Sequence, residues 1–510
     1  MAVFMQIAWS NIVGKAVVIT ILAVFACANT AVRAESILRA GTQFLPPGKG
    51  NAYRGITLPA VLPFQAIFDT LTALDKNGNV VPALAVSWHS NDAKTWTFNL
   101  RPGLKFSNGR PFNAEAVVKS AEYLMSPLGR TFTIGSTLYQ IFSARSLDEL
   151  TVEVKLNEPD AIFPLHASVW RIPDQATWNN LGFEAFVVQP IGTGPFEVAS
   201  WDEGKVTMTA FRGSWRAPRI DGLEIIQIAD QTARLQALVS GAVDYVMGLG
   251  PDDGAVVEAA GGQLVFRMTT QVHFIGFLTQ NETPLRDVRV RKALNYAVDR
   301  ESIIREILSG STVPTSQLAF PGAYGFNPDL SPYPYDPEIA RALLVEAGYG
   351  DGLDIVINIA LGRGSNDSIY FQQIAADLAK VGVRAKLRMR PQIQNQRELF
   401  NGKMKGDAFN LFVRGHDPIN AYRHRACSGR ATERVPYHCD KTLLPLIKAA
   451  KTQTDPAETR RLYREILARE YSDPPALFMW QGPEFDGLGR GVSGYRPSQD
   501  FINFHEMEMH

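Results

Sequence analysis

Short runs with the period-two alternation of β-strands recur along this 510-residue chain, separated by runs at helical spacing. Residues 80–88 and 95–100 are predicted to be strands on either side of a polar turn. Residues 150–156 alternate in the same way, with Val152 and Val154 on one side, as expected of a half-buried strand. The mixture of strand and helix patterns predicts an α/β fold.

The clearest α/β unit is predicted in the C-terminal half of the chain. Strand-like residues 355–360 and 383–389 flank a helical run over 369–380, a βαβ pattern that indicates a second α/β lobe. Helices are also predicted over 287–298 and after Asp336, which supplies an N-terminal cap followed by a first-turn proline. Both helices carry an apolar stripe, which we interpret as core packing.

Length and charge narrow the class of protein. At roughly 100–200 residues per domain, the chain has room for about two to four domains. Its 51 Lys and Arg are balanced by 51 Asp and Glu, whereas a protein that coats nucleic acid carries a basic excess, so we expect no nucleic-acid partner. Hydrophobic residues make up 45% and charged residues 20%, which excludes a disordered chain, a fibrous repeat and a coiled coil.

The first 34 residues have the features of a signal peptide. They contain no acidic residue, and Lys15 precedes an apolar run over 16–28. At about 13 residues this run is shorter than the ~20 apolar residues that span a bilayer. Small residues follow it, and cleavage is predicted after Ala34, with Ala31 as the alternative. No second long apolar segment follows, so we expect an exported, soluble protein.

The three cysteines fit an exported chain. Cys27 lies in the leader; a lipoprotein modified there and an uncleaved membrane anchor are alternatives, although the bulky Phe25 fits a lipobox poorly. Removal of residues 1–34 leaves 49 basic against 51 acidic residues, together with Cys427 and Cys439. Two cysteines twelve positions apart in an exported protein are most simply a disulfide, which contributes roughly 2–3 kcal/mol.

Searches for motifs of catalysis and metal binding find none that fits. Gly-x-Ser-x-Gly, the Walker phosphate loop and the zinc helix His-Glu-x-x-His are not present in the sequence. Residues 191–196 resemble a glycine loop, but Pro195 is incompatible with a helix-opening phosphate cradle. We interpret these residues as a tight backbone crossing before a strand.

One stretch, residues 411–438, is rich in arginine and contains no lysine. Its charged, histidine and tyrosine residues are Arg414, Arg423, Arg425, Arg430, Arg434, Asp417, Glu433, His416, His424, His438, Tyr422 and Tyr437. A guanidinium binds a carboxylate through two hydrogen bonds, so one interpretation is recognition of an anionic group on a solute. A solvated surface loop held by the disulfide is the other interpretation. A metal site is not expected, because the spacing of the histidines and cysteines fits no standard zinc pattern.

Several stretches together resemble a known family. They are residues 82–88, 95–101, 103–106, 109–114, 192–196, 288–300 and 335–349. In this order, after a signal peptide, they are similar to the extracytoplasmic solute-binding proteins of ABC importers, in the peptide/nickel-binding group known as family 5. The resemblance spans about 60–500 of the chain.

The resemblance implies a two-lobed α/β periplasmic-binding-protein fold with an extra subdomain inserted in the first lobe. The first lobe is expected to comprise 35–80, 190–275 and 485–510, the inserted subdomain 81–189, and the second lobe 276–484. A ligand is expected between the lobes, which close around it by a hinge motion. The resemblance implies a periplasmic monomer without enzymatic activity or cofactor, which delivers its ligand to permease subunits in the inner membrane.

The resemblance also suggests a ligand site in the second lobe. Peptide binders of the family hold the peptide's ammonium group with an Asp four residues before a proline. Here the matching proline is Pro418, which places Arg414 at the Asp position and leaves Asp417 out of register. The predicted ligand-binding residues are Arg414, His416, Asp417, Tyr422, Arg423 and Trp480.

Two classes of ligand are therefore predicted. A di- or oligopeptide is the expectation for the group. An acidic or N-modified solute, such as an opine-like conjugate, is the alternative, because a buried Arg414 would repel an ammonium group and favour a carboxylate. Two other functions stay open: an exported hydrolase, and a binding protein that delivers its ligand to a sensor or holds unfolded chains.

Overall fold

The computed structural model describes residues 35–510 except 56–57, 362–365, 420–436 and 497–498. The elements named here all lie in one compact unit, Ile37–His510. The predicted signal peptide, residues 1–34, lies outside the described residues. No helix within the described part of the chain is long and apolar enough to cross a bilayer.

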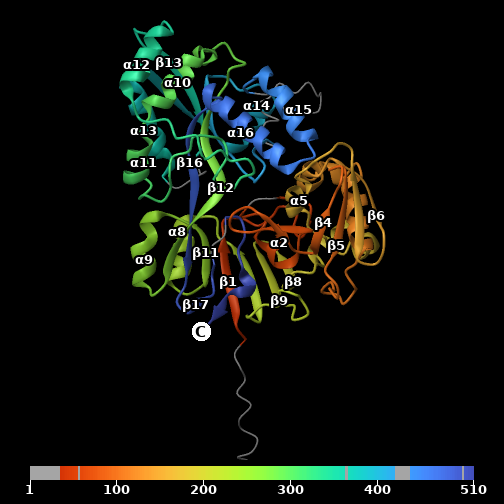
Figure 1. The fold of residues 1–510 in the computed structure, drawn as a ribbon. Helices are drawn as coiled ribbons and strands as arrows, with labels where there is room; N and C mark the ends of the chain where they lie inside the picture. The colour runs from red at the N-terminus through yellow and green to blue at the C-terminus, as the bar shows by residue number, and fades with distance from the viewer. Residues whose placement is uncertain (1–34, 56–57, 362–365, 420–436, 497–498) are drawn as a thin grey trace, which may run out of the picture. The chain divides into compact units, whose positions relative to one another are not determined.

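One ten-stranded mixed sheet runs through the unit (Figure 1). In sheet order its strands are β14 (Val383–Met389), β13 (Leu353–Ile359), β15 (Ala408–Val413), β12 (Gln263–Phe277), β16 (Ala476–Leu488), β11 (Tyr245–Leu249), β1 (Ile37–Thr42), β10 (Gly222–Gln227), β9 (Lys205–Ala210) and β8 (Phe196–Asp202). Strand β1 runs parallel to β10 and β11, and β13 runs parallel to β14 and β15. Each end of the sheet therefore has its own parallel α/β core.

Strands β12 and β16 connect the two ends. They are 15 and 13 residues long and antiparallel, from Gln263 opposite Leu488 to Gly276 opposite Ala476. One end of the pair lies beside β11 and the other beside β15. The chain thus forms two lobes, a first around β1 and β8–β11 and a second around β13–β15, as the family resemblance implied.

The second lobe contains the predicted βαβ unit and both predicted helices, the one over 287–298 and the one after Asp336. Its helices are α10 (Val288–Ala297), α11 (Arg300–Glu306), α12 (Pro337–Glu346), α13 (Asp367–Ala379), α14 (Gln392–Phe400), α15 (Leu444–Thr452) and α16 (Pro456–Ser472). Asp287 and Asp336 cap α10 and α12 by accepting backbone N–H groups of the first turn. The apolar stripe of α10 is buried, which confirms its interpretation as core.

A separate four-stranded antiparallel sheet lies within the predicted inserted subdomain. Its strands, in sheet order, are β4 (Ala85–His89), β5 (Thr95–Leu100), β7 (Thr151–Leu156) and β6 (Ile141–Ser146). Its helices are α3 (Ala114–Met125), α4 (Thr133–Thr137), α5 (Phe163–His166), α6 (Gln175–Leu181) and α7 (Phe183–Val188). The exact boundaries of the three parts stay a prediction.

Shorter elements complete the first lobe. They are α2 (Leu62–Ile67), α8 (Gln231–Val239), α9 (Gly254–Ala259), and the two-stranded pairs β2 (Thr72–Leu74) with β3 (Val80–Pro82) and β17 (Val492–Ser493) with β18 (Glu508–Met509). The strand structure predicted over 80–88 is present, but it is divided between β3 and β4, which belong to different sheets. Pro82 ends β3, since a proline has no N–H to extend the ladder.

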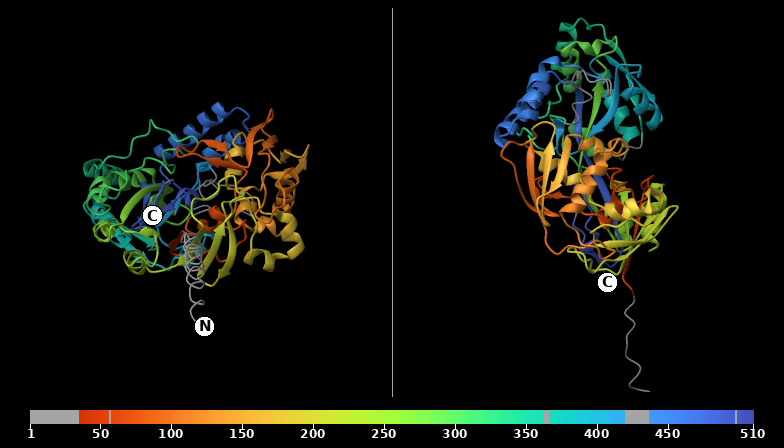
Figure 2. Two further views of the ribbon diagram at one scale, coloured as in Figure 1. Left: turned by 90° about the horizontal axis from the view of Figure 1, so that it is seen from below. Right: turned by 90° about the vertical axis from the view of Figure 1, so that its right-hand side faces the viewer.

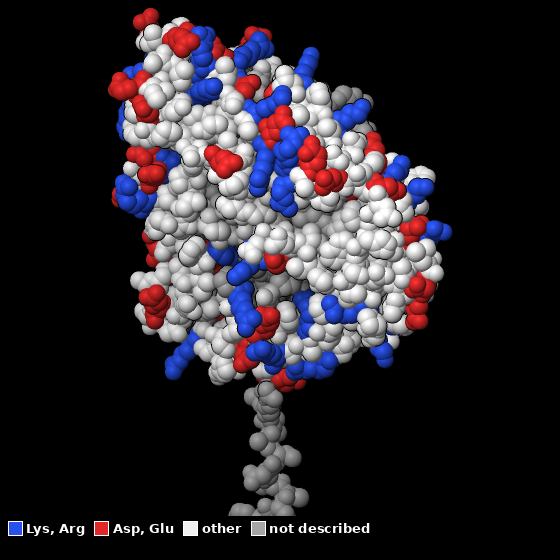
Figure 3. All heavy atoms as spheres, viewed as in Figure 1, with Lys and Arg blue, Asp and Glu red and all other residues white. Residues whose placement is uncertain are grey.

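The cores show how the parts are joined. One apolar cluster unites the first lobe with the inserted subdomain, and two others fill the second lobe. A fourth cluster joins Ile162 and Leu165, at α5 of the inserted subdomain, to α15 and α16 of the second lobe. Figure 2 shows the inserted subdomain, in orange, beside these blue helices. On the face drawn in Figure 3, basic and acidic side chains are interspersed over the described residues, in keeping with the balanced composition.

Candidate ligand-binding cavity

A cavity of about 610 Å³ lies where the two lobes and the inserted subdomain meet. Its wall comes from α2 and β2 of the first lobe, from α5 of the inserted subdomain, from residues 414–417 after β15, and from the C-terminal segment 499–505. A volume of this size suits a ligand of small-peptide dimensions, since binding pockets run from about 300 to 1,000 Å³. The wall includes three of the six predicted ligand-binding residues: Arg414, His416 and Asp417.

Arg414 follows the last residue of β15 and is held with few hydrogen bonds. Its Nη1 donates to the backbone oxygen of Leu58 at 3.3 Å, and its guanidinium stacks 4.4 Å from the ring centre of Phe412. Its Nε is buried and has no hydrogen-bond partner among the described residues. Burial lowers the pKa of Arg414, and the nearby carboxylates Glu484 and Asp500 partly offset that effect. Arg414 thus retains donors for an anionic group.

Asp417 is occupied by partners from the protein. Its Oδ2 lies 3.0 Å from Nε2 of His166, and its Oδ1 accepts from the hydroxyl of Tyr463 at 3.0 Å and from the backbone N–H of Ile419 at 2.9 Å. His166 belongs to the inserted subdomain, whereas Asp417 and Tyr463 belong to the second lobe. The carboxylate therefore ties these two parts together.

The protonation state of His166 follows from its geometry. Its Nδ1 lies 2.7 Å from Asp160 Oδ2 while its Nε2 faces Asp417. A neutral imidazole carries only one N–H, so both carboxylates are satisfied only by the doubly protonated ring. Burial lowers the pKa of His166, but Asp160 and Asp417 outweigh it and raise the pKa to about 10. We refer to His166, Asp160, Asp417 and Tyr463 as the latch.

His416 faces the cavity as a neutral ring. Its edge packs against Phe320 at 5.0 Å between ring centres, and its Nδ1 lies 3.5 Å from the backbone oxygen of Gly322. Burial lowers the pKa of His416, so the side chain adds polarity and no charge at neutral pH.

On the first-lobe side, Asp69 forms the centre of a closed network. It accepts from Thr193 at 2.8 Å and from Trp215 Nε1 at 2.9 Å, and it forms an ion pair with Arg216. Thr193 lies in the predicted backbone crossing. A Cβ added at Gly192 would lie 2.1 Å from the backbone oxygen of Ile67 in α2, so the crossing there is as tight as the sequence indicated.

The C-terminal segment brings a carboxylate that sequence reasoning missed. Asp500 lines the cavity, and its Oδ2 accepts from the hydroxyl of Thr270 on β12 at 2.6 Å. Its backbone oxygen accepts from Gln65 Nε2 of α2, whose Oε1 accepts from the N–H of Ile502. No motif marks Asp500, because only the tertiary fold brings residue 500 beside residues 65 and 270.

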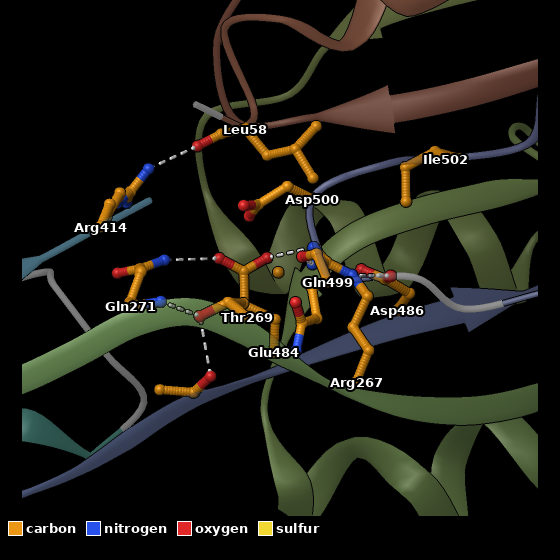
Figure 4. Close-up of polar contacts among 12 residues, drawn as sticks. Leu58, Arg267, Thr269, Gln271, Arg414, Glu484, Asp486, Gln499, Asp500 and Ile502 are labelled. Atoms are coloured by element: carbon orange, nitrogen blue, oxygen red, sulfur yellow. Dashed lines mark hydrogen bonds and ion pairs between the residues drawn. The ribbon is translucent and has the colours of Figure 1, made fainter. Parts of the chain in front are cut away.

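A buried ion cluster lies beneath this segment, on the connecting strands (Figure 4). Arg267 on β12 donates to Asp486 at 2.8 Å, to Glu484 at 2.7 Å and to the backbone oxygen of Gln499 at 2.7 Å. Burial lowers the pKa of Arg267, but the two carboxylates more than offset it and raise that pKa. Burial raises the pKa of Glu484, which Arg267 partly opposes.

Comparison with known proteins identifies the family. Residues 79–428 match the sequence profile described as bacterial extracellular solute-binding proteins, family 5 middle. The chain belongs to this family. The resemblance noted from the sequence motifs is thereby confirmed.

The similarity to individual proteins of known name or structure extends over most of this chain. The dipeptide-binding protein of Escherichia coli (strain K12) is 28% identical over 448 residues, which is 82% of this chain and 83% of that protein. The periplasmic binding protein DppA from Helicobacter pylori, solved with the peptide STSA, is 21% identical with a TM-score of 0.76, over 93% of this chain and 98% of that one. The binding protein AgaA from A. tumefacien R10, solved with agropinic acid, is 25% identical with a TM-score of 0.74, over 93% of this chain and 99% of that one.

The remaining predicted site residues lie elsewhere. Trp480 is 1% exposed in the core of the second lobe, with its ring centre 5.1 Å from that of Tyr370, and it is not among the cavity-lining residues. Tyr422 and Arg423 lie outside the described residues. So does Cys427, and its predicted disulfide with Cys439 stays a prediction.

Proposed function

We propose that this family 5 protein is the periplasmic solute-binding component of an ABC importer, which captures a di- or oligopeptide between its lobes and delivers it to permease subunits in the inner membrane. In this proposal the signal peptide is removed near Ala34, and the mature protein acts as a monomer without catalysis. The free energy of ligand binding drives closure of the lobes, because a ligand that contacts both lobes shifts the population toward the closed form.

The observation that carries the proposal is the cavity of about 610 Å³ lined by both lobes, in a member of the solute-binding family. The relatives add support for the peptide class. A similar protein from Escherichia coli (strain K12) is named a dipeptide-binding protein, and the structure from Helicobacter pylori contains the peptide STSA.

One observation favours a second candidate, an acidic or N-modified solute. Arg414 lines the cavity with a buried Nε that has no hydrogen-bond partner among the described residues. The carboxylate of Asp417 is held by His166 and Tyr463, so it is not available to an ammonium group. The AgaA structure, which contains agropinic acid, supports the same candidate. This alternative applies the same capture mechanism to a different ligand.

A thermal-shift screen tests the proposal. The protein is purified from the periplasm after expression of the full chain and screened against di- to pentapeptides, N-acetylated and acidic peptides, opine-type conjugates, oligosaccharides and nickel–histidine. A ligand at 100 times its Kd stabilises by about 2.7 kcal/mol, which is readily detected. Stabilisation by peptides supports the first candidate, and stabilisation by N-blocked acids alone supports the second. A protein that responds to neither class, or that hydrolyses a panel member, contradicts both.

A further inference from the structure

Four carboxylates line the described part of the cavity, and three of them are committed to other partners. Asp69 binds Arg216 and two further donors, and Asp417 accepts three hydrogen bonds within the latch and from its own loop. Asp75 accepts two backbone N–H groups and the side-chain amide of Asn79 within its own turn. The side chain of Asp500 has one donor, Thr270, and among the described residues it forms no ion pair.

The basic residues of the cavity wall can likewise be divided into those that have partners within the protein and one that has no ion-pair partner among the described residues. Arg171 donates to three backbone oxygens, Arg216 pairs with Asp69, and the exposed Arg496 lies 3.7 Å from Glu506. Lys76 is exposed to solvent at the edge of its turn. Arg414 is partly buried, and no carboxylate of the described residues pairs with it.

Among the described residues, Arg414 and Asp500 are therefore the partly buried, complementary charges that line the cavity without an ion-pair partner, and no ion pair joins them to each other. Arg414 lies on the second lobe after β15, whereas Asp500 is fixed to the first lobe by Gln65 and to β12 by Thr270. Asp500 is near enough to affect Arg414 electrostatically, and Figure 4 shows both residues together with the hydrogen bond of Arg414 to Leu58. A buried charge without a partner is unfavourable, so both groups gain when a ligand supplies the opposite charge.

We propose that the ligand is a zwitterion with a free ammonium group, which Asp500 binds, and a carboxylate, which Arg414 binds. The inference rests on the proposed function and selects the free peptide over the N-blocked solute. It makes Asp500 the cation-binding residue of this site, a role that Asp417 cannot fill while it holds His166 and Tyr463.

The test uses a peptide mixture in four chemical forms. A protein hydrolysate of short peptides is divided into four portions: one is left untreated, one is N-acetylated, one is methyl-esterified, and one receives both modifications. The protein purified from the periplasm is mixed with each portion, and the fraction of protein that carries bound peptide is measured by native mass spectrometry. The wild type is expected to prefer the untreated form over each blocked form by about ten- to a hundredfold, since a charge-assisted hydrogen bond is lost each time.

Two variants separate the roles of the two side chains. Asp500→Asn is expected to lose the preference for free amines and to keep the preference for free carboxylates, whereas Arg414→Gln is expected to show the reverse. Each variant thereby serves as the folding control for the other. Arg384→Gln removes an exposed charge from β14, which does not line the cavity, and is expected to keep both preferences.

The outcomes also distinguish failure of this inference from failure of the proposed peptide-binding function. If the wild type retains peptides but Asp500→Asn keeps the full preference for free amines, Asp500 does not bind the ammonium and the inference is overturned. The same holds if the wild type retains amine-blocked peptides equally well. If it retains no form of the hydrolysate, the peptide function itself fails, and this inference fails with it.

Discussion

Replacement of His166 by glutamine should destabilise the protein by several kcal/mol, because it removes the cation between two carboxylates. The side chains of His166, Asp160 and Asp417 are 15%, 15% and 12% exposed, so solvent screens them weakly. Removal of one member of a buried ion pair costs about 3–5 kcal/mol, since the remaining charge stays buried. A pKa raised from 6.5 to about 10 corresponds to a similar magnitude, about 4 kcal/mol at pH 7.

The pH dependence gives a second, independent signature. A histidine whose pKa is raised on folding contributes fully below its unfolded pKa near 6.5, and the contribution is lost as the pH rises through about 10. Tyr463 and Tyr324, which also face this site, have pKa values raised by burial, so they stay protonated over this interval. The stability difference between wild type and His166→Gln should therefore shrink between about pH 7 and pH 10.

Urea unfolding at a series of pH values measures both effects. His89→Gln is the matched control, because His89 is exposed on β4 of the same subdomain, and it should change the unfolding free energy by less than about 0.5 kcal/mol. If His166→Gln unfolds within 1 kcal/mol of the wild type at about pH 7, the ring is not the buried imidazolium described above. A difference that stays constant up to about pH 10 would refute the same reasoning.

Three further changes test other parts of the structure. Asp417→Asn should lower stability by about 2–4 kcal/mol, measured by urea unfolding, yet leave the preference for free peptide amines intact in the retention assay. Trp480→Ala should cost about 3–5 kcal/mol by the same unfolding measurement, because the ring is 1% exposed, and the ligand preferences of the folded fraction should be unchanged. Gly192→Ala should lower the melting temperature, with a loss of roughly 1–3 kcal/mol, because the new methyl group would meet the backbone of Ile67 at 2.1 Å.

Local patterns in the sequence predicted individual helices and strands, and the family resemblance supplied the two-lobed arrangement. The cap at Asp336 and the βαβ unit of the second lobe depend on neighbouring residues, so the sequence alone identifies them, whereas the cap at Asp287 was found only in the structure. The break between β3 and β4 was missed, because apolar residues continue across Pro82 and only the change of sheet separates the two strands.

The site was only partly accessible to the same reasoning. Arg414 and Asp417 were found because they lie in an unusual arginine-rich stretch, and both line the cavity. The sequence could not show that Asp417 is occupied, because its partner His166 is 251 residues away. Asp500 has no local signal at all, since the contacts that place it come from α2 and β12.

The positions of Arg414 and Asp500 also connect ligand chemistry to lobe movement. Asp500 follows Gln499, whose backbone oxygen is held by Arg267 within the ion cluster of the connecting strands. In the hinge motion that the family resemblance implies, a rotation of the lobes would bend β12 and β16, so that Asp500 would stay with the first lobe and Arg414 would move with the second. On the zwitterion proposal, a ligand that carries both charges joins the two lobes and stabilises the closed form. A solute with only one of the charges would bind one lobe through that charge, so its binding would shift the equilibrium toward the closed form less strongly.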